Sequence, residues 1–162
     1  MTVPGTEFRI RTARPHDAPA IADVHYRAIK VLGPTAYPPE IVESWAAGLR
    51  PEGYRLHEAQ PGRFMDVAVG PYDDPVGFCD YRKGEIVALF TAPEHVRRGI
   101  GSALLARAEA VTRAAGVATI TLDAALSARL FWIRHGFIPC GEIEITSRGG
   151  LPIRVIRMEK TL

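Results

Sequence analysis

The chain has 162 residues, of which 47% are hydrophobic and 23% are charged, and its formal net charge at pH 7 is +2. This length is enough to bury a core, and we expect one domain over residues 1–162. So small a charge gives no indication of nucleic-acid binding, no run of eighteen apolar residues indicates a membrane span, and residues 1–7 lack signal-peptide character.

Cys79 and Cys140 are the two cysteines of the chain, and they lie far apart in different apolar contexts. This usage predicts small buried free thiols rather than a disulfide or a metal site, and it is typical of a reducing compartment. We therefore expect a soluble cytoplasmic protein that holds no metal.

Hydrophobic periodicity and Gly/Pro punctuation predict the elements in chain order. A short strand at 8–11 precedes two helices, at 17–32 and 39–48, and residues 49–62 are predicted to be loop. The remaining elements are strands at 64–69, 76–82 and 85–91, a helix at 101–115, a strand at 117–122, a short helix at 128–135, and a hairpin with strands at 137–145 and 152–158.

This order predicts an α/β (α+β) fold with a mixed, mostly antiparallel sheet flanked by helices. The strand at 85–91, the helix after it and the strand at 117–122 form a right-handed parallel crossover, which places the start of the helix beside the end of a strand. A ligand site is expected at that strand end.

The predicted site is the segment 96–102, Val-Arg-Arg-Gly-Ile-Gly-Ser, which we call the glycine turn. The first N–H groups of a helix have no partner within the helix, and the helix dipole adds partial positive charge there. Gly99 and Gly101 allow a tight turn and a close approach to the backbone, so the turn favours a phosphate or pyrophosphate. It lacks the Lys-Ser/Thr of a Walker loop and the third glycine of a dinucleotide fingerprint, although a nucleotide ligand remains an alternative.

Three segments resemble the GNAT superfamily of acetyl-CoA-dependent N-acetyltransferases, in the manner of its small bacterial members. They are EIVALFTAPEHVRRGIGSALL (85–105), LDAALSARLFWIRHGF (122–137) and RMEK at the end of the closing hairpin (157–160). Together with the element order, the resemblance covers essentially the whole chain. It implies a GNAT-like fold with a splayed central sheet and acetyl-CoA as the cofactor.

The resemblance also implies which residues bind coenzyme A. Its pyrophosphate would lie on the backbone amides of the glycine turn, and its pantetheine arm would run along the strand at 85–91, with the helix at 128–135 flanking the thiol. The cofactor-binding residues expected on this basis are Leu89, Phe90, Thr91, Val96, Arg97, Arg98, Gly99, Ile100, Gly101, Ser102, Ala128 and Phe131. Val96 stands where the family usually has Gln or Arg.

Two residues are singled out for catalysis. Glu85 occupies a place where some family members keep a general base, with a surface charge as the alternative, and Asp80 and Asp123 are weaker candidates. Trp132 stands where many members have the tyrosine that protonates the departing thiolate, and an indole cannot release its proton in that way. A backbone N–H near residues 90–92 is expected to stabilise the oxyanion.

We therefore predict direct transfer of an acetyl group to a primary amine of a small molecule or peptide. The alternative is a non-catalytic CoA-binding module with a regulatory or sensor role. It is motivated by Trp132 and by Ala125, which stands where the family often has Ser or Asn. Variable segments such as 47–62 are expected to shape the acceptor pocket, and Tyr37 and Trp45 are candidates for its walls. The edge of the closing hairpin could pair across a homodimer.

Overall fold

The computed structural model describes residues 7–162 as one continuous sheet with helices on both faces. The expectation about a signal segment falls almost wholly on residues 1–6, outside the described part. The strands are β1 (Arg9–Thr12), β2 (Arg63–Val69), β3 (Pro75–Arg82), β4 (Glu85–Thr91), β5 (Thr119–Ala125), β6 (Ile138–Thr146) and β7 (Pro152–Thr161). The helices are α1 (Ala18–Leu32), α2 (Pro39–Ala46), α3 (Ile100–Ala114) and α4 (Arg129–Arg134).

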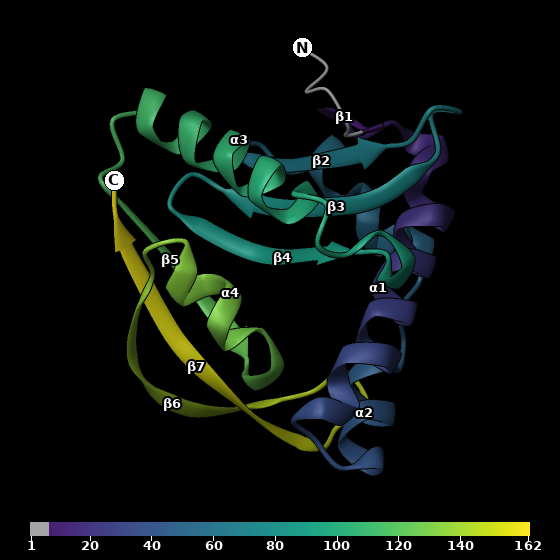
Figure 1. Cartoon of the computed structure of the whole chain (residues 1–162), viewed down its shortest axis with the longest axis vertical. Coiled ribbons are helices and arrows are strands. Elements are labelled where there is room, and N and C mark those ends of the chain that lie inside the picture. The colour runs from purple at the N-terminus through teal and green to yellow at the C-terminus, as the bar shows by residue number, and fades with distance from the viewer. Residues whose placement is uncertain (1–6) are drawn as a thin grey trace.

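The seven strands lie in the order β1-β2-β3-β4-β5-β7-β6, and every neighbouring pair except β4–β5 is antiparallel. The parallel pair β4–β5 is joined at one position, Glu85 opposite Thr121, and the strands then part toward their C-terminal ends. Figure 1 shows this division, with β1 to β4 on one side and β5, β7 and β6 curving away on the other. The mixed, splayed sheet predicted from the sequence is thus confirmed.

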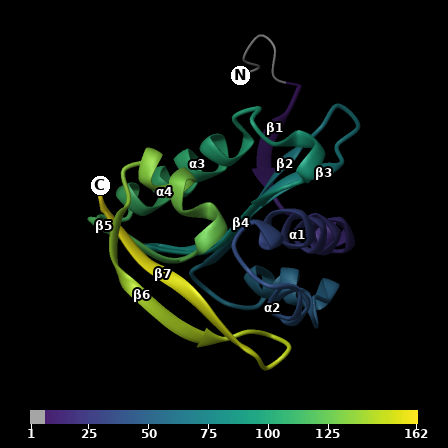
Figure 2. The same cartoon turned by 60° about the horizontal axis from the view of Figure 1, so that its bottom comes forward.

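The helices form two layers (Figure 2): α3 and α4 cover one face of the sheet, and α1 and α2 cover the other. Side chains of β4 alternate between these layers as the pleat requires. Leu89 packs in the core beneath α3 and α4, whereas Ala88 and Phe90 pack in the core beneath α1. A bulge at Val87 interrupts the pairing of β4 with β3, since Asp80 lies opposite Ala88 but Tyr81 lies opposite Ile86.

Two expectations were wrong. Residues 49–62 are not plain loop, because a 3₁₀ segment at Pro51–Glu58, labelled η3, buries Tyr54 against α1. Its Pro and Gly residues suggested irregular backbone, and the long-range contact of Tyr54 has no local signature. Cys79 is buried as expected, but Cys140 is exposed because it lies on β6, a strand at the edge of the sheet whose residues are almost all exposed.

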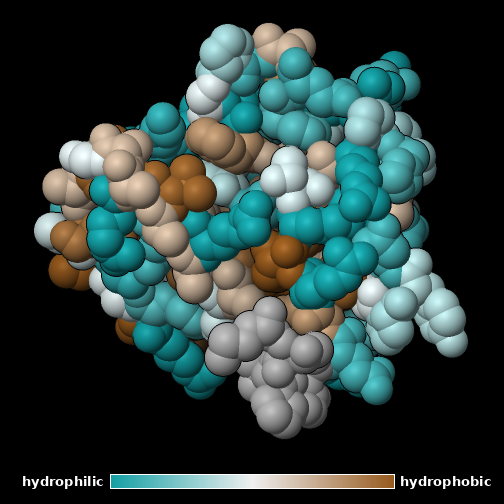
Figure 3. Space-filling model, turned by 90° about the horizontal axis from the view of Figure 1, so that it is seen from above, coloured by the Kyte–Doolittle hydropathy of each residue, from teal (hydrophilic) through white to brown (hydrophobic). Residues whose placement is uncertain are grey.

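β6 is the outer strand of the sheet, and its pairing with a second chain stays a prediction. The face shown in Figure 3 is largely hydrophilic, with apolar side chains in small separate groups. Within residues 7–162, no helix has both the length and the hydropathy needed to cross a bilayer.

Candidate active site

A cavity of about 1210 Å³ opens where β4 and β5 part, and we call it the central cavity. Its walls come from both faces of the sheet, with Leu89, Gly101 and Phe131 on one side and His25 and Trp45 on the other. Because β5 does not pair with the end of β4, the opening between the strands connects the two faces. Two ligands entering from opposite sides could meet there.

The parted strands leave part of the β4 backbone free. The Ala92 N–H donates to the Val76 carbonyl at 2.8 Å, and Phe90 lies opposite Phe78 on β3. Because N–H and C=O groups alternate along a strand, those of Leu89 and Thr91 point the other way, into the gap. The oxyanion donor expected near residues 90–92 therefore cannot be Ala92, and Leu89 and Thr91 are the available positions.

The glycine turn lies at the mouth of α3, as the sequence predicted. Gly99 precedes the helix with φ +80°, a left-handed conformation that costs a side chain about 1–2 kcal/mol, and Arg97 also has a positive φ of 64°. The first helical bond runs from the Ala103 N–H to the Gly99 carbonyl, so the N–H groups just before it have no helical partner. The resulting cradle of amides at the positive end of a helix suits an anionic phosphate.

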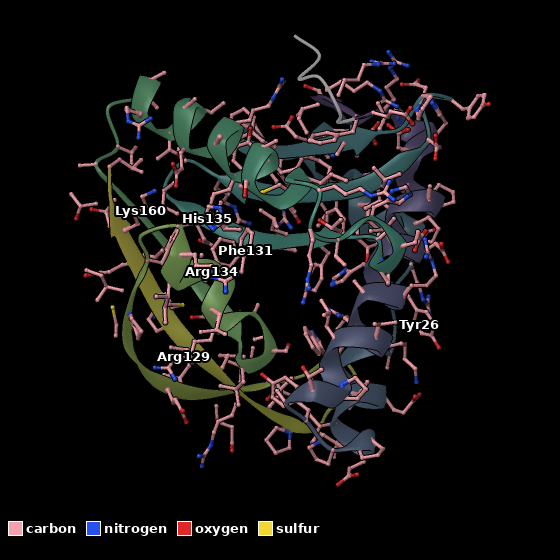
Figure 4. All side chains as sticks on the ribbon, in the orientation of Figure 1. Tyr26, Arg129, Phe131, Arg134, His135 and Lys160 are labelled. Carbon is pink, nitrogen blue, oxygen red and sulfur yellow. The ribbon has the colours of Figure 1, made fainter. Side chains whose placement is uncertain are left out.

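Helix α4 packs directly on this turn. A Cβ added to Gly101 would lie 3.1 Å from the Phe131 ring, so the glycine permits the close approach. His135 Nδ1 donates to the Phe131 carbonyl at 2.7 Å, and His135 Nε2 and the Ser102 hydroxyl share a hydrogen bond of 2.8 Å. Figure 4 shows Phe131, Arg134 and His135 on the side of α4 that faces α3 and β4.

Most of the cofactor-binding residues expected from the sequence line the cavity, including Ala128 and Phe131. Arg98 does not: its guanidinium lies 3.3 Å from His95 Nδ1, outside the cavity, although its backbone belongs to the turn. Phe90 contributes its ring from the α1 face, whereas Leu89 and Thr91 present backbone to the gap. The predicted residues thus differ in what they offer the cavity: some present backbone atoms and others present side chains.

The two catalytic candidates both line the cavity. Glu85 lies where β4 and β5 still join, its side chain is half exposed, and its nearest cation is Arg82 at 3.5 Å. Trp132 is 5% exposed and packs in the core against Phe131 and Phe137 at 5.0 and 5.2 Å between ring centroids. Trp132 is therefore a packing residue that also borders the cavity.

The other carboxylates of the cavity are held by arginines. Asp80 accepts two hydrogen bonds from Arg63, at 2.8 and 2.5 Å, and Asp123 accepts two from Arg157, at 2.6 and 3.3 Å. Such charge-assisted pairs fix both side chains. Among the carboxylates of the cavity, Glu85 is the one with the weakest ion pair.

On the α1 face, aromatic rings surround the end of the cavity, and we call this region the aromatic chamber. His25 lies at its centre, with ring centroids 4.3 Å from Phe90, 5.3 Å from Phe78 and 5.9 Å from Tyr54. The His25 Nδ1 and Tyr54 hydroxyl share a hydrogen bond of 2.8 Å. The chamber is defined by His25, Trp45, Tyr54, Phe78, Phe90 and Arg148, all of which line the cavity.

Burial controls the charge state of the chamber. Desolvation, assisted by the positive charge of Arg148, lowers the pKa of His25 to about 3, so its imidazole is neutral at physiological pH. Desolvation also raises the pKa of Tyr54 to about 12 and keeps the phenol protonated. A base this weak does not deprotonate an ammonium ion. We therefore assign His25 the role of holding the Tyr54 side chain in place through their hydrogen bond.

No sequence signal identified His25, Tyr54, Phe78 or Arg148 as site residues. Trp45 lines the chamber as anticipated, but Tyr37 does not. The Tyr37 hydroxyl instead donates to the Arg154 carbonyl at 2.6 Å and accepts from the Leu126 N–H at 2.9 Å, so it joins the start of α2 to β7 and to the end of β5.

The sheet opens between two parallel strands beside an amide cradle, so the central cavity can admit two ligands from opposite faces. Residues 62–139 match the family described as "Acetyltransferase (GNAT) domain". The chain belongs to the GNAT superfamily of acetyltransferases.

Among its relatives is the "Uncharacterized N-acetyltransferase YafP" of Escherichia coli (strain K12), 28% identical over 142 residues that cover 88% of this chain and 89% of that protein. A GCN5-related N-acetyltransferase structure from Rhodopseudomonas palustris superposes with a TM-score of 0.84 at 25% identity, covering 100% and 99% of the two chains. The PaiA N-acetyltransferase of Thermoplasma acidophilum, solved in complex with coenzyme A, shares the fold with a TM-score of 0.75, 21% identity and coverage of 96% and 99%.

Proposed function

We propose that this chain is an acetyl-CoA-dependent N-acetyltransferase that moves an acetyl group directly to a primary amine. The observation that carries the proposal is the gap between β4 and β5, which leaves the Leu89 and Thr91 backbone unpaired beside the amide cradle of the glycine turn. A phosphate-bearing ligand with an extended amide-containing arm fits this combination of a cradle and an open strand. Neighbouring structures carry coenzyme A or acetyl-CoA in the same fold.

In this proposal the backbone of the glycine turn holds the diphosphate, and the Leu89 and Thr91 groups hold the pantetheine arm. Acetyl-CoA supplies a thioester whose carbonyl carbon is attacked by the amine and whose thiolate departs. The free N–H groups of β4 are the donors available to the carbonyl oxygen as it gains negative charge. Phe131 and Trp132 limit the access of water along the α4 wall.

The acceptor nitrogen must lose protons for the C–N bond to form while the C–S bond breaks. An alkylamine with a pKa of about 10.4 is mostly protonated at neutral pH, whereas a thiol with a pKa of about 8.5 leaves readily as thiolate. Removing the amine proton is therefore the greater need, and the lack of an acidic hydroxyl at Trp132 is tolerable. At a strand rise of about 3.3 Å per residue, Glu85 lies about 13 Å along β4 from Leu89. Glu85 therefore accepts the amine proton through intervening water rather than by direct contact.

We place the enzyme in the cytoplasm, a location supported by its two free thiols, of which Cys140 is exposed. Its acceptor is a small molecule or a peptide terminus that reaches the aromatic chamber.

The test offers purified protein acetyl-CoA and a panel of primary amines, and measures the release of free thiol and the melting temperature. We expect acetyl-CoA to raise the melting temperature and at least one amine to release thiol. Stabilisation by acetyl-CoA, without thiol release in the presence of any amine, would favour the non-catalytic CoA-binding module. Stabilisation by ATP or NAD and not by acetyl-CoA would contradict both.

A further inference from the structure

The turn between β6 and β7 is fastened to α2 on both sides of Arg148. The Gly149 N–H donates to the Ser44 carbonyl at 2.8 Å, and the Leu151 N–H donates to the Ser44 hydroxyl at 3.1 Å. The Ser44 and Ser147 hydroxyls share a hydrogen bond of 2.5 Å, and both serines are buried. Figure 2 shows the hairpin reaching toward α2 from the far side of the sheet.

Gly149 makes this contact tight. A Cβ on Gly149 would lie 2.8 Å from Ser44 Cα and 2.9 Å from the Ser44 carbonyl oxygen, both backbone atoms that cannot move aside easily. Residues that flank Arg148 are thereby fixed, so the position of Arg148 over the chamber is built into the fold.

Six arginines line the cavity, and four of them, Arg50, Arg97, Arg134 and Arg148, have no carboxylate partner within residues 7–162. Arg148 is the one of these four whose charge acts on both His25 and Tyr54. Arg63 is paired with Asp80 and Arg157 with Asp123, but no hydrogen bond or ion pair engages the Arg148 guanidinium within residues 7–162. It lies close enough to influence His25 and Tyr54, and desolvation lowers its own pKa. Arginine nevertheless stays charged, so the rim of the chamber carries an exposed cation that has no anionic partner within the described residues.

We propose that the acceptor is a primary amine of amino-acid size that also bears a carboxylate, and that Arg148 binds this carboxylate. The inference rests on the proposed function and names the class of its substrate. A guanidinium presents two parallel N–H groups that match a carboxylate. The aromatic rings of the chamber offer an apolar surface to the rest of the acceptor, so an apolar side chain is favoured.

Binding in the absence of turnover tests the inference most cleanly. The protein saturated with coenzyme A is titrated calorimetrically with L-phenylalanine, L-leucine and L-methionine. Each is compared with the amine that lacks only the carboxylate: 2-phenylethylamine, 3-methylbutylamine and 3-(methylthio)propylamine. We expect at least one amino acid to bind tenfold or more tightly than its decarboxylated partner.

Arg148→Gln removes the charge and should abolish this preference while the affinity for coenzyme A stays unchanged. Arg154→Gln is the matched control, because Arg154 lies on the same hairpin with an exposed side chain outside the cavity. The inference is overturned if no amino acid binds, if the decarboxylated amines bind equally well, or if Arg154→Gln causes the same loss.

Thiol release separates this inference from the proposed function. A carboxylate preference that depends on Arg148, without thiol release from acetyl-CoA in the presence of any amine, overturns the enzymatic proposal and supports the role of Arg148. Equally efficient thiol release from acetyl-CoA with carboxylated and decarboxylated amines supports the enzyme and overturns the role of Arg148.

Discussion

At the mouth of α3 the central cavity is lined by backbone amides, whereas in the aromatic chamber it is lined by side chains. The glycine turn is built from two small residues and a positive φ, with Val96 standing where the family usually has Gln or Arg. The chamber needs a specific ring or charge from each of α1, α2, η3, β3, β4 and the β6–β7 turn. A backbone site can hold a constant cofactor while a side-chain site changes its acceptor, which explains how a shared fold serves different substrates.

Gly99→Val should give the largest effect on this contrast. A β-branched residue at φ +80° is strained, and the amides around it would move. We expect the affinity for acetyl-CoA to fall about 100-fold, or about 2.7 kcal/mol, measured by calorimetry. Gly116→Val is the control, since Gly116 has φ +76° and open space at the other end of α3. An equal loss in the control would remove the special role of the turn.

Acid should destabilise the chamber. The pKa of His25 is about 3 in the folded protein, below its ordinary value of 6.5, so the unfolded chain binds a proton that the folded chain rejects between these values. Stability is therefore lost as the pH falls, by up to about 1.4 kcal/mol per pH unit from this group. Urea denaturation from pH 6.5 to 4 should show a shallower loss for His25→Gln, and parallel curves would contradict the assignment.

Gly149→Ala tests the chamber without changing a charged residue. The added Cβ would push the hairpin turn away from Ser44 and displace Arg148. We expect the affinity for the preferred amino acid to fall about tenfold, with unchanged affinity for coenzyme A. Gly141→Ala, on β6, has nothing near the added Cβ but is strained at φ +134°, so it controls for a loss of stability without displacement of the turn. A loss of affinity for coenzyme A alone would show that the aromatic chamber and the glycine turn are not separate sites.

Glu85→Gln tests the point where β4 and β5 join. If Glu85 accepts the amine proton through water, kcat should fall about tenfold while the KM for acetyl-CoA stays constant. The loss should shrink as the assay pH approaches the pKa of the amine, because less deprotonation is then needed. Asp123→Asn serves as comparison, since Asp123 is already paired with Arg157. A pH-independent loss would indicate a structural role for Glu85.

Trp132→Phe should have the smallest effect on the reaction. The indole packs against Phe131 and Phe137, so the smaller ring leaves a void that costs about 1–2 kcal/mol of stability. An indole supplies no proton, so kcat should stay within about twofold once the variant is folded. A large drop in kcat at unchanged stability would give Trp132 a direct part in the chemistry.

The same contrast explains what the sequence could reveal. The strands, the helices and the glycine turn were predictable because their signals are local: alternation, helical spacing and two glycines before a helix. The hydrogen bond between His25 and Tyr54 spans 29 residues, and the one between Ser44 and Ser147 spans 103. No local pattern encodes such contacts, so the sequence indicates only that Arg148 lies between the two strands of the closing hairpin. Cys140 was misjudged for the same reason, because its exposure depends on which strand ends the sheet.

Hydrogen–deuterium exchange on addition of coenzyme A tests the division of the cavity most directly. The account predicts slower exchange for peptides covering 86–92 and 96–103, with peptides covering 44–54 and 147–151 unchanged until an amino acid is added. Protection by coenzyme A at 147–151, or none at the glycine turn, would contradict it.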